Sequence, residues 1–99
     1  MKKQAILDLI KIFGLYVICD SWNDDSYLKI HWDKSANCAY SINYLIISKH
    51  FDNTEEKICK ELRGYLMRKG EYDFKLKVIK AIGNIFPELT YRDKKEMFD

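Results

Sequence analysis

The chain has 99 residues, of which 47% are hydrophobic and 14% aromatic. That is enough for one domain with a modest core of its own, and we expect residues 1–99 to form a single domain. The 17 basic and 15 acidic residues give a net charge of +2 at pH 7, which excludes the strongly basic surface typical of nucleic-acid binders. No segment has the length and hydropathy of a membrane span, so we expect no membrane partner.

An odd number of cysteines without metal-type spacing argues against a disulfide framework. Free, buried thiols in a reducing cytoplasm are the better interpretation of Cys19, Cys38 and Cys59.

The N-terminal segment shows helical periodicity. Apolar residues recur at Ile6, Leu9, Ile10 and Phe13, which predicts an amphipathic helix over residues 2–13. Gly14 follows where a helix end favours a left-handed residue. Charged residues interrupt the apolar run, so we expect mature structure rather than a signal peptide.

The next segment reads as a β-hairpin over residues 15–32, with turn chemistry at residues 23–26. If Asp24 and Asp25 form the centre of the turn, residues whose numbers sum to 49 face each other, and Asp20 pairs with Lys29. Side chains alternate across a strand, so this register separates two faces. The expected core face holds Leu15, Val17, Cys19, Leu28, Ile30 and Trp32. The opposite face holds Tyr16, Ile18, Asp20, Trp22, Tyr27, Lys29 and His31.

The remaining chain predicts one strand and then helices. Residues 38–48 favour a third antiparallel strand, although a buried helix would also tolerate this composition. Asn53 and Glu56 can form a capping box for a second helix that ends at residues 68–70. Its buried stripe is Ile58, Leu62, Tyr65 and Leu66.

A third helix over residues 73–86 is favoured over a strand at 72–78, and Pro87 ends it. Thr90 can cap a short terminal helix over residues 90–98. The expected fold is α+β in the order α-β-β-β-α-α, with a three-stranded antiparallel meander packed against helices.

No catalytic, metal or cofactor motif of real specificity is present, and we expect no cofactor and no metal. Neither His31 nor His50 has the spacing of a zinc ligand set. Cys19 or Cys59 could act as a nucleophile only through accidental proximity to a histidine. Four aspartates invite a small metal-dependent nuclease, the least favoured reading, because two are turn residues and one can pair with Lys29. They are Asp20, Asp24, Asp25 and Asp33.

The opposite hairpin face is the best candidate for a functional site, because large aromatic side chains dominate binding hot spots. We expect the partner-binding set to be Tyr16, Asp20, Trp22, Asp24, Asp25, Tyr27, Lys29 and His31. If a later helix covers this face, its aromatic residues belong to the core instead. An open aromatic face implies a protein partner or a homodimer.

The favoured function is therefore a non-catalytic, cytoplasmic protein-binding module that acts as a stoichiometric inhibitor. In size and style only, the chain resembles small accessory proteins of phages and other mobile elements, and toxin-immunity proteins. The alternative is a nucleic-acid-associated regulator that uses the basic helices of residues 54–86. Its contacts would be Lys57, Lys60, Arg63, Arg68 and Lys69.

Overall fold

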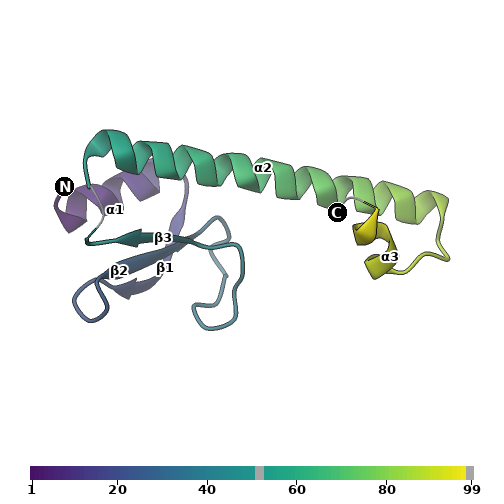
Figure 1. Ribbon diagram of the computed structural model, residues 1–99, viewed down its shortest axis with the longest axis horizontal. Helices are drawn as coiled ribbons and strands as arrows, with labels where there is room; N and C mark the ends of the chain where they lie inside the picture. The colour runs from purple at the N-terminus through teal and green to yellow at the C-terminus, as the bar shows by residue number, and fades with distance from the viewer. Residues whose placement is uncertain (51–52, 98–99) are drawn as a thin grey trace. The chain divides into compact units, whose positions relative to one another are not determined.

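The computed structural model describes residues 1–50 and 53–97. Its elements in chain order are α1 (Lys3–Ile12), β1 (Tyr16–Ser21), β2 (Tyr27–His31), β3 (Leu45–Ser48), α2 (Glu55–Ile85) and α3 (Tyr91–Glu96) (Figure 1). This arrangement confirms the predicted α+β class and element order. Residues 1–66 and residues 67–99 form two compact units, and α2 contributes to both. That the whole chain is one domain stays a prediction.

The first unit is a three-stranded antiparallel sheet with helices on one face. The strand order is β1-β2-β3, and Figure 1 shows α1 and the first part of α2 on the same side of the sheet. Each fully buried aliphatic side chain stabilises such a core by about 1.5–3 kcal/mol. The most deeply buried residues are Ile6, Ile10, Leu28, Ile30, Ile58, Leu62 and Tyr65. The predicted buried stripes of the first and second helices are confirmed.

The end of α1 is as predicted. Gly14 has a φ of +71°, a left-handed conformation that side chains with a Cβ disfavour. Its backbone N–H donates to the carbonyl of Lys11 at 3.0 Å. The chain can therefore reverse into β1 immediately after one turn of helix is closed.

The predicted hairpin register is wrong. Val17 pairs with Ile30, but Cys19 pairs with Lys29, so Ile18 is an extra residue in a β-bulge. Ser21 faces Tyr27 across the turn, where the prediction placed Trp22. A one-residue slip exchanges the two faces of a strand.

Three side chains change face as a result. Trp22 is only 8% exposed and belongs to the core, while Cys19 leaves the expected core face. Asp20 does not pair with Lys29. Its Oδ2 forms an ion pair with Lys3 Nζ of α1 at 2.7 Å. Its Oδ1 accepts a hydrogen bond from the Trp22 backbone N–H at 3.2 Å.

The third strand is shorter than predicted. Only Leu45–Ser48 pairs with β2, and residues 38–44 form turns and irregular backbone. Asn43 has a φ of +62°, which a strand interior does not accommodate. Leu45 and Ile47 point into the core, whereas Ile46 on the other face is exposed.

One long helix replaces the second and third predicted helices. α2 continues through Gly70 because one interior glycine costs only about 1 kcal/mol relative to alanine. An ion pair from Lys69 Nζ to Asp73 Oδ2 at 3.1 Å spans that position. The helical prediction for residues 72–78 is therefore confirmed, and the predicted break at residues 68–70 is wrong.

Both predicted N-terminal caps can be compared with the structure. The Thr54 Oγ1, rather than Asn53, accepts from the backbone N–H of Lys57 at 3.4 Å, while the Asn53 side chain donates to the carbonyl of Lys49 at 3.2 Å. The cap of α3 is as predicted, because Thr90 and Asp93 form a reciprocal capping box. Residue 98 of the predicted terminal helix lies outside the described residues.

Candidate functional site

The sheet has a second face that carries no helix in the described part of the first unit. Leu28 and Ile30 point into the core, so the alternate residues of β2 point the other way. Their cross-strand partners share that side. We call this the open face, and it holds Tyr16, Cys19, Ser21, Tyr27, Lys29, His31, Ile46 and Ser48.

The structure divides the predicted binding residues. Tyr16, Tyr27, Lys29 and His31 lie together on the open face, as expected. Asp24 and Asp25 are exposed in the turn at the end of the hairpin. Trp22 and Asp20 point toward the helices, so the open face lacks the tryptophan that the prediction placed at its centre.

A segment after β2 contacts Lys29 and His31 of the open face, and two of its backbone carbonyls anchor it. The carbonyl of Ile42 lies 2.9 Å from His31 Nε2, and the carbonyl of Asn43 accepts from the Tyr65 hydroxyl at 2.6 Å. Tyr65 also stacks on Trp32, with ring centroids 4.8 Å apart. The segment is therefore tied to the sheet and to α2 by side chains that are themselves buried or packed.

The hydrogen bonds of His31 define its tautomer. Its Nδ1 lies 2.9 Å from the backbone N–H of Asp33, which can only donate. Nδ1 therefore accepts, and Nε2 carries the proton that it donates to Ile42. His31 is buried. It holds the backbone of the segment at Ile42 and is not exposed for contact with a partner.

The anchored segment displays apolar side chains to solvent. Tyr40 is 87% exposed and Ile42 is 72% exposed, and Tyr44 and Ile46 are exposed as well. The Tyr44 ring is held by Lys29, whose Nζ lies 4.2 Å from the ring centroid. We call these four side chains the apolar rim. Ser41 and Asn43 separate the first three of them in the sequence, and this alternation does not distinguish the rim from a strand.

Two cysteines neighbour Lys29 beside this segment. Lys29, the cross-strand partner of Cys19, donates from Nζ to the carbonyl of Cys38 at 3.3 Å. The Sγ of Cys19 lies 3.4 Å from Ser21 Oγ. All three cysteines are free and partly exposed, so the prediction of buried thiols is wrong.

The surroundings of these thiols separate their acidities. Hydrogen bonds from Ser21 and then Cys38 lower the pKa of Cys19, with a smaller contribution from the positive charge of Lys29. The hydrogen bond to Cys19 raises the pKa of Cys38. Cys19 is therefore the more readily ionised thiol of the pair.

The residues of the nucleic-acid alternative do not form an uninterrupted basic surface. Lys57, Lys60 and Arg63 are exposed on α2, and so are the carboxylates Glu55, Glu56 and Glu61. Three positive and three negative charges leave this stretch neutral. Lys69 is paired with Asp73. This mixture is typical of a solvated helix surface.

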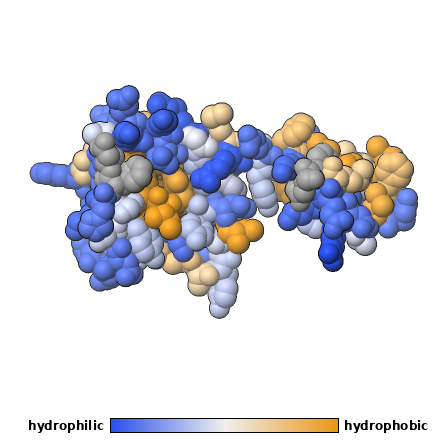
Figure 2. All heavy atoms as spheres, in the orientation of Figure 1, coloured by the Kyte–Doolittle hydropathy of each residue, from blue (hydrophilic) through white to orange (hydrophobic). Residues whose placement is uncertain are grey.

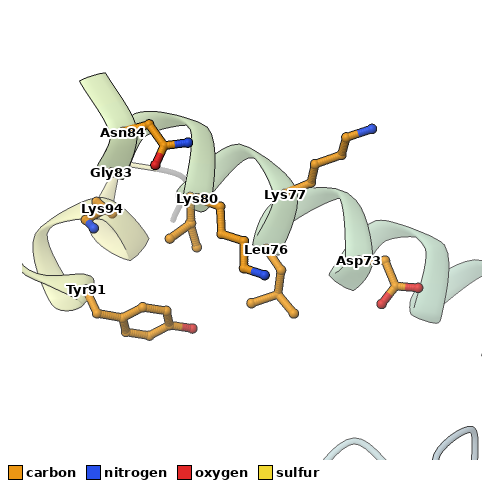
Figure 3. A pocket seen from close by; sticks show the side chains of 9 residues that line it. Asp73, Leu76, Lys77, Lys80, Gly83, Asn84, Tyr91 and Lys94 are labelled. Atoms are coloured by element: carbon orange, nitrogen blue, oxygen red, sulfur yellow. The ribbon is translucent and has the colours of Figure 1, made fainter. Parts of the chain in front are cut away.

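The second unit contains an open groove of about 790 Å³ between the distal part of α2 and α3. Leu76, Ile79, Lys80, Tyr91 and Lys94 are among its lining residues (Figure 3). Figure 2 shows hydrophobic side chains at the surface of this unit. The groove combines apolar side chains with the ammonium groups of Lys80 and Lys94.

Two classes of feature are missing from the described residues. Within residues 1–50 and 53–97, no three histidine, cysteine or acidic side chains come together as a metal ligand set. No helix in the same ranges combines the length and hydropathy needed to cross a membrane.

No family model, curated protein or solved structure matches this chain.

Proposed function

We propose that this chain is a non-catalytic module that binds another protein through the apolar rim at residues 40–46. The observation that carries the proposal is the anchoring of these exposed side chains by His31 and Tyr65. Burial of an exposed apolar side chain by a partner lowers the free energy of the complex. Anchoring the backbone before binding lowers the entropy cost of association.

The chemistry of the partner follows from the charges around the rim. Lys29 contacts Tyr44 of the rim, and Asp33 follows His31. The other aspartates of residues 20–33 lie elsewhere, because Asp24 and Asp25 are in the hairpin turn and Asp20 pairs with Lys3 of α1. Asp33 stays ionised to low pH because the backbone N–H and then the hydroxyl of Ser35 lower its pKa. A protein surface with an apolar centre and one charged group of each sign at its edge would complement this arrangement.

The finer form of the proposal is an inhibitor of the immunity-protein type, which works by occupying its partner's surface. The support is the small size of the chain together with a preformed rim. The compartment that we propose is the cytoplasm, which the three free cysteines support.

The test uses the full chain as bait, followed by titration calorimetry with the purified captured protein. Tyr40→Ser combined with Ile42→Ser should weaken binding by about 30-fold or more, as expected when hot-spot contacts worth at least 2 kcal/mol are lost. Ile12→Ser is the matched control, because Ile12 is 76% exposed on α1 and should leave the affinity unchanged.

Three outcomes would refute the proposal. Equal affinity of the rim variant and the wild type would show that the rim is not the contact. Capture of nucleic acid with a steep salt dependence would favour the basic residues of α2. Recovery of a second copy of this chain alone would identify a homodimer instead.

A further inference from the structure

The open face of the sheet carries two cysteines that come from different segments. Cys19 lies in β1, directly after the bulge at Ile18, and Cys38 lies in the segment after β2 that contacts this face. Lys29 links them, because it is the cross-strand partner of Cys19 and donates to the Cys38 carbonyl at 3.3 Å. Each of the two thiols also shifts the pKa of the other.

We propose that Cys19 and Cys38 are a redox-active dithiol that forms a reversible disulfide by exchange with a low-molecular-weight disulfide. This goes beyond the proposed protein-binding function and does not depend on it. Both cysteines lie next to Lys29, and a disulfide requires their sulfurs to come within about 2.05 Å of each other. Cys38 lies outside regular secondary structure, so local movement of its segment can supply that approach.

The order of attack follows from the environment of each sulfur. Ser21 lies 3.4 Å from the Cys19 sulfur, and its hydroxyl is the main cause of the lowered pKa of Cys19. Cys38 has the higher pKa of the two. The thiolate is the attacking species in exchange, so Cys19 attacks first and Cys38 resolves.

The exchange balances in two steps. The Cys19 thiolate attacks one sulfur of the small disulfide, forms a mixed disulfide and releases one small thiolate. The Cys38 sulfur then attacks the Cys19 sulfur, forms the Cys19–Cys38 bond and releases the second small thiolate. The two cysteine protons end on the two released thiolates. The cysteines are oxidised by two electrons and the small disulfide is reduced.

Cys59 provides an internal control within the same chain. It lies on α2 and is partly exposed like the other two. Among the described residues it forms no hydrogen bond with another cysteine. Trypsin separates all three cysteines, because lysines occur at positions 29, 34, 49 and 57 between them. A linked pair of peptides therefore identifies its two cysteines unambiguously.

The experiment equilibrates the full chain with reduced and oxidised glutathione at increasing ratios of the oxidised form, followed by acid quenching, alkylation and peptide mapping. We expect loss of two hydrogens from the intact mass and a linked pair of peptides containing Cys19 and Cys38. Cys59 should remain alkylated, and dithiothreitol should restore both free thiols. An unlinked pair at every ratio, or links that involve Cys59, would overturn the proposal.

The single variants test the order of attack. In Cys38→Ser the mixed disulfide of Cys19 with glutathione should accumulate, because the resolving thiol is gone. In Cys19→Ser the remaining Cys38 should form its mixed disulfide several-fold more slowly. Equal rates for the two variants, with native circular dichroism in both, would refute Cys19 as the attacking thiol.

Discussion

Replacement of Trp22 by alanine tests the bulged register directly, because the register decides whether this side chain lies in the core. Trp22 is buried with Leu28, Ile30 and Ile58 in one cluster. Removal of a buried tryptophan leaves a large cavity and costs about 3–5 kcal/mol. A domain of this size is stable by about 5–15 kcal/mol, so the loss is a large fraction of the total.

The assay is urea unfolding at pH 7, followed by far-ultraviolet circular dichroism. With an m-value of about 1.5 kcal/mol/M, a loss of 3–5 kcal/mol lowers the urea midpoint by about 2–3 M. Trp22→Phe retains part of the volume and should cost about 1–2 kcal/mol. It remains measurable if Trp22→Ala does not fold.

The matched control is Tyr40→Ala on the apolar rim, where Tyr40 is 87% exposed. Its free energy of unfolding should change by no more than about 0.5 kcal/mol. A Trp22→Ala midpoint equal to that of Tyr40→Ala would show that Trp22 lies outside the core, and the bulged register would then be refuted.

Four further perturbations test other parts of the structure. Gly70→Ala should stabilise by about 0.5–1 kcal/mol in thermal unfolding, because no atom lies within 4 Å of the added Cβ, whereas Gly14→Ala at φ +71° should destabilise. Lys3 holds the pKa of Asp20 below its usual value, so the stability that Asp20→Asn removes should be fully present above about pH 5. This difference should shrink as the pH falls below about 4, and a difference independent of pH would contradict the assignment. Deletion of Ile18 removes only the unpaired residue of the bulge. Native circular dichroism and the glutathione-induced disulfide should therefore both persist, and loss of the disulfide would count against this bulge.

The helical periodicity of apolar residues was sufficient to predict the helices that pack on the core. Ile6 and Ile10 repeat at helical spacing in α1, and so do Ile58 and Leu62 in α2, and all four are buried. The break predicted at Gly70 failed because a single glycine is a weak signal. The exposed ion pair of Lys69 with Asp73 across that position offsets part of its cost.

The shape of the hairpin and of the segment beyond it could not be predicted in the same way. Ile18 is apolar and β-branched like its neighbours, so nothing in the pattern marks it as the unpaired residue of the bulge. Tyr40, Ile42 and Tyr44 alternate with polar residues as a strand would, yet long-range contacts to His31 and Tyr65 hold this segment out of the sheet. Alternation reports only that side chains point to two sides, not which backbone they follow.

The bulge at Ile18 decides which side chains of β1 point into the core and which point to the open face. Because one residue is left unpaired, Val17 faces the core with Ile30, and Cys19 faces the other side with Lys29. If Ile18 were instead paired in a regular strand, the even-numbered and odd-numbered positions of β1 would keep one alternation throughout. Trp22 would then point away from the helices, and Cys19 would point toward them. The same offset that buries the tryptophan therefore brings the Cys19 thiol to the side where Lys29 and Cys38 lie.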